Sequence, residues 1–299
     1  MKAAVYYAAK DMRIEDVPEP TPKEGQVKIK VKWCGICGTD LHEFTGGPTL
    51  VSQTPHPLTG QKAPLILGHE FSGDIVELGP GLSGDWKVGD RVTVDPCIVC
   101  HECYECKHAH YNICAKLGFV GLASDGAFAE YTLAEEYQLY KLPDNVTYEQ
   151  GAFTEPASVG VHAVRRSGIS LGEEVVIVGL GPIGLLSGQA AIAAGAAHVY
   201  GVDMSKARRE GAVNAGFAQA FDPTVCDAAA EVKKLANGIG AHTAINCSGN
   251  DASMRTCIEA TRGGGTIICP GHGGGKPCSI YPMTDLNFHE KTVMGSHVY

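Results

Sequence analysis

The sequence lacks a long uninterrupted apolar run. Its longest apolar stretch, residues 175–186, is interrupted by three glycines and a proline and is shorter than the roughly 20 residues that span a bilayer as a helix. Residues 1–9 alternate like a strand and lack the charged start and apolar core of a secretory leader. These absences exclude a membrane-spanning helix and lead us to expect a cytoplasmic protein without a membrane partner.

Positive charge is also scarce. The chain has 24 Lys and Arg against 33 Asp and Glu, which gives a formal net charge of −9. An acidic chain has no electrostatic reason to bind nucleic acid, so we expect no such partner. Repeats and low-complexity tracts are absent too. At ~100–200 residues per domain, a chain of 299 residues predicts two domains.

Short candidate strands dominate the first half of the chain. β-Branched and aromatic residues recur at residues 27–33, 71–78, 91–94 and 127–133, separated by Gly, Pro and Asp clusters. Regular spacing of this kind predicts a β-barrel or sandwich. Residues 46–64 are rich in Pro, Thr and Gly without a period. They predict a long irregular loop, and loops of that length are often functional.

The second half alternates strands with helices. The predicted strands are 175–178, 199–202, 218–221, 244–246, 266–269 and 292–298, and the predicted helices are 183–194, 206–215, 228–235 and 252–260. This order predicts βαβ units around a parallel sheet. We therefore expect one domain over residues 1–155 and a second, doubly wound α/β domain over residues 156–299.

A glycine turn follows the first strand of the second half. Gly179, Gly181 and Gly184 form G-x-G-x-x-G, and Asp203 stands at the end of the next strand. In this context the glycines allow a tight turn, a close approach to a pyrophosphate and close helix packing. The helix N-terminus attracts the phosphates. The pattern indicates a dinucleotide site, and a purely structural turn is the alternative.

Asp203 bears on the choice of cofactor. Its carboxylate would accept hydrogen bonds from the adenosine ribose and repel a 2′-phosphate, which favours NAD over NADP. Arg208 and Arg209 argue against this choice, because a nearby Arg can accommodate a 2′-phosphate. Capping the following helix is the other role open to Asp203.

Four cysteines lie close together in the first half. Cys100, Cys103, Cys106 and Cys114 have the number and spacing that a closed tetrahedral zinc site needs. Cys97 is a fifth thiol that could exchange with one of them. Reduced core cysteines and a redox pair are the alternatives, although clustered cysteines in a reducing compartment favour a metal.

A second set of metal-binding residue types is scattered. Cys37, His69, Glu70 and Glu155 offer the thiolate, imidazole and carboxylates that a catalytic zinc would use. Their spacing alone does not indicate a site, and a solvated His-Glu pair is the alternative.

The chain resembles the zinc-containing alcohol and polyol branch of the medium-chain dehydrogenase/reductase family along essentially its whole length. The motifs shared with the family lie at residues 68–70, 88–92, 100–114, 125–131 and 179–184. Within the branch, the long loop with its segment 55–60, and the segments 118–124 and 154–164, resemble 2,3-butanediol dehydrogenases. Sorbitol dehydrogenases share the same motifs.

This resemblance implies a GroES-like β-barrel catalytic domain, with a zinc lobe at about residues 97–114, followed by a Rossmann domain. It implies a catalytic zinc on Cys37 and His69, with Glu155 as third ligand, directly or through water, and Glu70 as a ligand or exchange partner. Asp40 would orient the His69 ring, Thr39 would hydrogen-bond the substrate oxygen, and His42 would pass a proton to solvent. The implied cofactor residues are Gly179, Gly181, Pro182, Ile183, Gly184, Asp203, Arg208, Gly271 and Ser296, with the backbone at His272 beside them.

The activity that the resemblance implies is hydride transfer between a secondary alcohol and NAD. The substrate would be a vicinal diol such as 2,3-butanediol, with acetoin reduced in the reverse direction, and the chain would hold two zinc ions and form a homodimer or homotetramer. A polyol dehydrogenase acting on sorbitol or xylitol and an inactive nucleotide-binding scaffold are the alternatives. Family chains continue past the position of Tyr299 and return to the first domain, so we expect that segment to be missing here.

Overall fold

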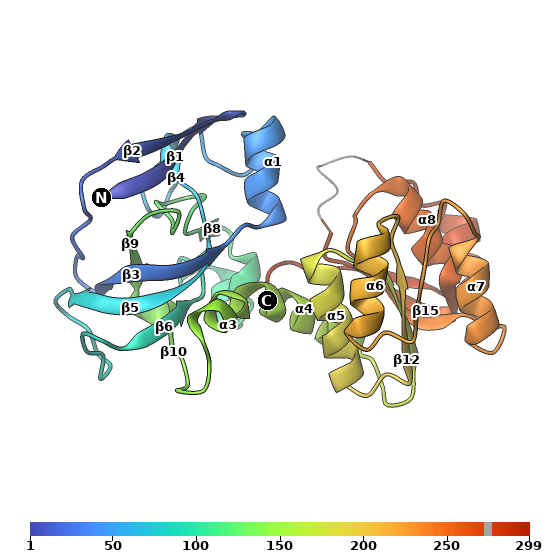
Figure 1. The fold of residues 1–299 in the computed structure, drawn as a ribbon. Coiled ribbons are helices and arrows are strands. Elements are labelled where there is room, and N and C mark those ends of the chain that lie inside the picture. The colour runs from blue at the N-terminus through green and yellow to red at the C-terminus, as the bar shows by residue number, and fades with distance from the viewer. Residues whose placement is uncertain (272–276) are drawn as a thin grey trace. The chain divides into compact units, whose positions relative to one another are not determined.

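Two compact units make up the chain. The computed structural model describes residues 1–271 and 277–299, and the chain divides into Met1–Glu155 and Pro156–Tyr299 (Figure 1). The first unit is β-rich and the second contains a parallel sheet, which confirms the predicted fold class. Among the described residues, no helix has the length and apolar character to cross a membrane. His272 lies outside the described residues.

Two antiparallel sheets of three and five strands build most of the first unit. Their strand orders are β2-β1-β4 and β10-β6-β5-β3-β9. The strands are β1 (Lys2–Ala8), β2 (Asp11–Asp16), β3 (Gln26–Gly35), β4 (Leu65–Ile66), β5 (Glu70–Leu78), β6 (Arg91–Val94), β9 (Tyr131–Glu135) and β10 (Leu139–Lys141). Val27, Ile29 and Ile75 are fully buried in one core. The alternating apolar residues that predicted β3 and β5 are therefore the inward face of these strands.

The predicted strand at 127–133 is wrong in position. Strand β9 begins only at Tyr131, because the backbone N–H groups of Ala127 and Phe128 donate to the carbonyls of Gly68 and Leu67. The sequence did not predict the short pair β7 (Cys97–Ile98) and β8 (Gly118–Phe119), which brackets the cysteine cluster.

Four α-helices among the described residues were also not predicted. They are α1 (Gly38–Gly46), α2 (Tyr104–Lys107), α3 (Tyr148–Ala152) and α4 (Thr154–Ser167). Helix α1 begins directly after Cys37, whose backbone N–H donates to the Asp40 carboxylate at 2.9 Å. The glycines of α1 lower its helix propensity, and Pro156 suggests a break in α4, although proline is tolerated in a first turn.

The predicted irregular loop is confirmed, since the described stretch between α1 and β4 contains neither helix nor strand. Polar contacts fix its ends. The fully buried Glu43 accepts hydrogen bonds from the backbone N–H groups of Thr49 (3.0 Å) and Leu50 (2.5 Å). Farther along, the Thr59 hydroxyl donates to the Ala123 carbonyl. The loop is therefore pinned to the barrel without regular structure.

The second unit is a six-stranded parallel sheet in the order β13-β12-β11-β14-β15-β16. Its strands are β11 (Glu174–Val178), β12 (His198–Val202), β13 (Gln219–Phe221), β14 (Ala241–Asn246), β15 (Thr261–Cys269) and β16 (Thr292–Gly295), and its helices include α5 (Pro182–Ala193), α6 (Lys206–Asn214), α7 (Ala228–Leu235) and α8 (Asp251–Ala260). All predicted elements are present, but β14 and β15 begin earlier and β16 ends at Gly295. The strand order reverses between β11 and β14, which is where doubly wound sheets bind ligands.

Both faces of this sheet are covered. Val175 and Ile177 of β11 pack in one buried cluster with residues of α4, α5 and α6. Val176 and Val178 pack in another with residues of α7 and α8. A strand buried on both faces explains why this run is apolar without alternation.

Replacing two helix glycines by alanine tests this packing, because the free energy of unfolding should fall for one variant and rise for the other. A Cβ at Gly188 in α5 would lie 2.0 Å from Cζ of Phe217, so Gly188→Ala should lower the free energy of unfolding by about 1–3 kcal/mol. A Cβ at Gly211 in α6 would meet nothing within 4 Å, so Gly211→Ala should raise it by about 0.5–1 kcal/mol, because glycine destabilises helices. Urea denaturation of both variants checks this, and a shift of the same sign in both would contradict it.

Candidate functional site

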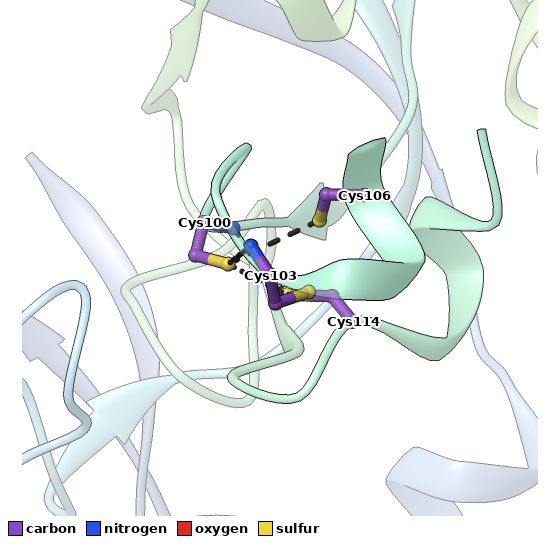
Figure 2. Close-up of side chains that lie close together, drawn as sticks. All are labelled: Cys100, Cys103, Cys106 and Cys114. Carbon is purple, nitrogen blue, oxygen red and sulfur yellow. Dashed lines mark hydrogen bonds between the residues drawn. The ribbon is translucent and has the colours of Figure 1, made fainter. Parts of the chain in front are cut away.

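The four clustered cysteines converge in space. They lie on the loop between β7 and β8, which contains the short helix α2 (Tyr104–Lys107), and their sulfurs all lie within 4.8 Å of one another (Figure 2). The Cys114 and Cys100 sulfurs are 3.5 Å apart, Cys103 and Cys114 are 3.9 Å apart, and Cys100 and Cys106 are 4.0 Å apart. Four sulfurs bound at about 2.3 Å around one zinc lie about 3.8 Å apart. The cluster therefore has the dimensions of a tetrahedral zinc site.

Backbone N–H groups lower the pKa of Cys100 and Cys103 in this cluster, whereas burial raises the pKa of Cys106 to about 12. The N–H groups of Cys103 and Cys100 point at the sulfurs of Cys100 and Cys114, each at 3.4 Å, and that of Lys116 points at Cys114 at 3.3 Å. Backbone N–H groups of Ala115 and Cys106 lower the pKa of Cys103 to about 6. Thiolates are the form that binds zinc, so the donor chemistry fits the metal.

Cys97 does not join the cluster. It is buried in β7, outside the group of four sulfurs. Its carbonyl accepts hydrogen bonds from the side chains of Tyr137 (3.2 Å) and Gln138 (3.1 Å), and burial raises the pKa of its thiol. Cys97 is thus a core residue of the barrel, and the structure gives no support to its exchange into the metal set.

A second donor set forms where β3 ends, α1 begins and β5 starts. The Cys37 sulfur, an imidazole nitrogen of His69 and a carboxylate oxygen of Glu70 lie within 4.8 Å of one another. His69 and Glu70 are buried, at 5% and 8% exposed. Three residues that are scattered in the sequence therefore meet as one thiolate, imidazole and carboxylate set, the ligand types of a catalytic zinc.

The charges around this set call for a cation. Burial, and then the charge of Glu70, raises the pKa of Cys37 to about 12, and burial raises the pKa of Glu70 to about 7. Burial also raises the pKa of Glu155 to about 8, and the charges of Glu70, Asp95 and Asp40 add to the rise. Buried acids that repel one another are stabilised by a metal ion, so the residues present fit zinc.

Glu155 stands close to the set but is not part of the group within 4.8 Å. It lies in the first turn of α4 and is 8% exposed. Glu70 completes the compact set. Which of the two carboxylates binds the metal directly is the choice that the resemblance left open, and it stays a prediction.

Asp40 and His69 face each other across a short gap. The Asp40 Oδ1 and His69 Nδ1 atoms are 3.7 Å apart, and both are buried without a hydrogen-bond partner among the described residues. This distance is too long for a hydrogen bond. The Asp40 carboxylate nevertheless faces Nδ1 of His69, which is the placement of a carboxylate that orients a metal-binding imidazole. Burial lowers the pKa of His69, which favours the neutral ring that a metal requires.

Thr39 and His42 lie on the first turns of α1. The Thr39 backbone N–H and hydroxyl are hydrogen-bonded to the Cys37 sulfur, and both act to lower the pKa of that thiol. His42 is exposed. Residues three apart on a helix share a face, so Thr39 and His42 can form a path from the buried set toward solvent.

The glycine turn has the shape that a dinucleotide needs. Gly179 has φ +95°, and a Cβ at Gly184 would lie 1.9 Å from the Gly179 carbonyl oxygen. A Cβ at Gly181 would meet no protein atom within 4 Å. Gly181 is the N-cap of α5 and has no side-chain cap, and Pro182 and Ile183 follow it. The chain therefore leaves the Gly181 position at this helix end uncovered by protein atoms, and helix N-termini attract phosphates.

Asp203 lies just after β12 beside this turn. Its carboxylate accepts hydrogen bonds from the backbone N–H groups of Leu180 and Ser205, each at 2.8 Å. Its proposed role as a helix cap is wrong, because Ser205 caps α6. Arg208 lies 3.5 Å from the Asp203 carboxylate, while Arg209 is bound to Asp222 at 2.9 Å. Of the two arginines, Arg208 is therefore the one ion-paired with the Asp203 carboxylate.

Gly271 and Ser296 lie at the same edge of the sheet. The Gly271 N–H donates to the Asn246 carbonyl (3.1 Å), and the Ser296 N–H donates to the Cys269 carbonyl (3.2 Å). These residues therefore stand at the carboxyl ends of β14, β15 and β16, on the edge where a doubly wound sheet binds its cofactor.

Two positioning glycines were not singled out from the sequence. A Cβ at Gly35 would lie 2.2 Å from Oε2 of Glu70, and Gly68, with φ +95°, would meet the Phe128 ring at 2.7 Å. Gly68 directly precedes His69, and a glycine next to a candidate ligand is the sequence feature that could have identified it. Both glycines make room for the metal set.

Both units match known dehydrogenases. Residues 23–144 match the alcohol dehydrogenase GroES-like domain, and residues 182–299 match the zinc-binding dehydrogenase family. The (R,R)-butanediol dehydrogenase of Bacillus subtilis is 43% identical over 99% of this chain and 84% of its own length. The sorbitol dehydrogenase of the same organism is 35% identical over 91% of this chain and 75% of its own length.

Solved structures agree with the sequences. The crystal structure of 2R,3R-butanediol dehydrogenase from Bacillus subtilis has a TM-score of 0.90 and 41% identity, over 100% of this chain and 84% of that one. A Sinorhizobium meliloti protein bound to NADP has a TM-score of 0.89 and 33% identity, over 99% of this chain and 84% of that one. With both units matched over nearly the full chain, the protein belongs to the zinc-dependent medium-chain dehydrogenase/reductase family.

Proposed function

We propose that this protein is a cytoplasmic NAD-dependent dehydrogenase that oxidises a vicinal diol such as 2,3-butanediol to a hydroxyketone. The observation that carries the proposal is the compact donor set of Cys37, His69 and Glu70. It occurs in a chain that is 43% identical to a butanediol dehydrogenase. The relative at 35% identity is a sorbitol dehydrogenase, so a polyol substrate is the second candidate.

Cys37, His69 and Glu70 would hold the catalytic zinc, with Glu155 as the ligand that exchanges with Glu70. When bound, zinc supplies Lewis acidity to a substrate oxygen and NAD accepts a hydride. Asp40 orients the His69 ring. The four cysteines Cys100, Cys103, Cys106 and Cys114 would hold a second, structural zinc.

The protein's own acid–base work falls to α1. The Thr39 hydroxyl would take the proton of the substrate hydroxyl while releasing its own proton along a relay, and the exposed His42 imidazole would accept that proton and pass it to solvent. His69 and Glu70 are buried, which would keep bulk water away from the proposed metal ligands. These residues therefore position the substrate and remove its proton.

NAD is the expected cofactor. The Gly179, Gly181 and Gly184 turn with Pro182 and Ile183 would hold the pyrophosphate, Asp203 the adenosine ribose, and Gly271 and Ser296 the nicotinamide end. Arg208 is ion-paired with Asp203, so a 2′-phosphate would have to displace that carboxylate.

The assembly is expected to be a homodimer or homotetramer. Strand β16 ends the order of the sheet, and on its outer side no described strand pairs with it. Tyr281, Met283 and Phe288, just before it, are 61%, 57% and 65% exposed. An unpaired edge beside exposed apolar side chains is a surface that a second copy can cover.

Substrate and cofactor are tested together in one assay. We expect NADH to form faster from 2,3-butanediol than from sorbitol or xylitol, and NAD to be preferred over NADP, because Asp203 repels a 2′-phosphate. The measurement is kcat/KM for each pair. Faster turnover of sorbitol would support the polyol assignment, and a preference for NADP would overturn the role of Asp203.

Variants of the two cysteine sites should separate chemistry from stability. Wild-type protein should contain about two zinc ions per chain and each variant about one. Cys37→Ser should abolish NADH formation with little change in thermal unfolding. Cys103→Ser should lower the unfolding temperature and leave turnover in the surviving protein. Metal analysis, calorimetry and the diol assay check these outcomes.

Two results would contradict this division. Unchanged turnover in Cys37→Ser would remove the catalytic-zinc assignment. About one zinc in the wild type, lost only in Cys103→Ser, would indicate an inactive nucleotide-binding scaffold with a single structural metal.

Assembly can be measured by sedimentation equilibrium. We expect the wild type to be a dimer or tetramer, and Phe288→Asp to shift it toward monomer, because the change places a charge in the covered surface. Leu171→Asp, at a residue 88% exposed elsewhere in the second unit, is the control and should not change the mass. A monomeric wild type would refute the assignment.

A further inference from the structure

Two buried hydroxyl side chains lie opposite each other on neighbouring strands of the first unit. Ser72 on β5 and Thr93 on β6 are register partners in this antiparallel pair, and they are 0% and 5% exposed. Directly opposite residues of an antiparallel pair present their side chains on the same face of the sheet. Helix α3 lies beside these two strands (Figure 1). We call Ser72 and Thr93 the hydroxyl pair.

Both members of the hydroxyl pair are hydrogen-bonded to the backbone of α3. The Ser72 hydroxyl donates to the Tyr148 carbonyl at 2.5 Å, and the Thr93 hydroxyl donates to the Gly151 carbonyl at 2.8 Å. A helix of five residues leaves most of its carbonyls without an intrahelical partner. Tyr148 and Gly151 are three residues apart and therefore share one face of the helix. Two hydroxyls on one face of the sheet thus match two carbonyls on one face of α3.

Close packing supports these hydrogen bonds. A Cβ at Gly151 would lie 2.9 Å from Cβ of Ser72 and 2.8 Å from Cδ1 of Leu142, so a glycine allows α3 to approach β5. The Tyr148 hydroxyl donates to the Asp74 carboxylate, which belongs to β5 as well. Helix α3 is therefore held on the sheet through two of its carbonyls and one of its side chains.

The hydroxyl pair connects the segments that contain two buried carboxylates. Glu70 precedes Ser72 by two residues on β5, so both side chains leave the same face of the strand. Glu155 follows Gly151 by four residues and lies in the first turn of α4. Burial, and then the charge of Glu70, raises the pKa of Glu155 to about 8, so the two carboxyl groups interact. The strand of one carboxylate is thus bonded to the helix that precedes the other.

Hydrogen bonds do something here that apolar contacts would not. Apolar burial is non-directional, so an apolar pair would hold α3 against the sheet without fixing it along its axis. Two directional hydrogen bonds fix both the position and the rotation of the helix. Zinc binds carboxylate oxygens at about 2.0–2.2 Å, so a small shift of the helix changes whether a carboxylate that follows it can reach a metal.

We propose that Ser72 and Thr93 are positioning residues that hold the Glu155 carboxylate within reach of the proposed catalytic zinc. The hydroxyl pair fixes α3, and α3 fixes the first turn of α4, where Glu155 lies. This assignment rests on the proposed function. It adds that the affinity for this zinc depends on two hydroxyls that are not themselves ligands.

The test measures the dissociation constant of this zinc by competition with a chelator, without turnover. The ion in question is the one that Cys37→Ser lacks. Thr93→Val, which removes the hydroxyl and keeps the shape, should weaken its binding by roughly 10-fold or more, as expected for a residue that orients a metal ligand. Thr93→Ser retains the hydroxyl and should bind zinc as the wild type does.

Thr132→Val is the matched control. Thr132 is a buried threonine on β9 of the same unit, and its hydroxyl has no hydrogen-bond partner among the described residues. The same substitution therefore removes a buried hydroxyl without releasing α3, and zinc affinity should equal that of the wild type.

A double-mutant cycle with Glu155→Gln separates positioning from a general loss of structure. Because the hydroxyl pair acts through Glu155, Thr93→Val should not weaken zinc binding further in Glu155→Gln protein. The visible spectrum of bound Co²⁺ reports the geometry of the same site, with the spectrum of Cys37→Ser subtracted to isolate it. Thr93→Val should change this spectrum toward that of Glu155→Gln, and Thr132→Val should leave it unchanged.

The outcomes distinguish this inference from the proposed function. If Thr93→Val weakens zinc binding equally with and without Glu155→Gln, or does not weaken it at all, the inference is wrong while the catalytic zinc stands. If Thr93→Val fails to fold, the same cycle with Ser72→Ala decides in its place. If Cys37→Ser retains as much zinc as the wild type, the proposed catalytic site is wrong and the inference fails with it.

Discussion

The burial of negative charge is the constraint on which the first unit depends. Asp40, Glu70 and Glu155 are at most 8% exposed, and they share their surroundings with the Cys37 thiol. Bringing such groups out of water costs several kcal/mol per charge unless an opposite charge accompanies them. A zinc ion held by Cys37, His69 and Glu70, as proposed above, would supply that charge. Without it, burial raises the pKa values of Cys37, Glu70 and Glu155, so these groups can remain protonated and neutral inside the fold.

Glycine residues, which have no Cβ atom, leave the space that these ligand residues occupy. Gly35 lets the Glu70 carboxylate lie against β3, and Gly68 turns the chain so that His69 enters the set. The same device recurs in the second unit. Gly184 lets α5 approach β11, and Gly181 leaves open the space that a pyrophosphate would take. In both units the ligand position is defined as much by absent Cβ atoms as by the groups that bind.

The sequence could predict those features that depend on local pattern. Alternating strands and helices, the glycine turn and the four-cysteine spacing each have a short-range signature, and the structure contains all of them. The set of Cys37, His69 and Glu70 has none, because antiparallel pairing of β3 with β5 brings it together. Helix α4 was missed for a related reason, since Pro156 suggests a break where the fold places a first turn.

Glu43 is a buried polar group whose hydrogen bonds are satisfied by the protein itself. Its carboxylate is fully buried, and the backbone N–H groups of Thr49 and Leu50 donate to it. His162 and Ser296 are treated differently, since each has a buried polar atom without a described partner. A fold that can satisfy a buried carboxylate inside an irregular loop has the means to satisfy an imidazole beside a strand end. The unpaired atoms of His162 and Ser296 are therefore exceptions to the pattern that Glu43 follows.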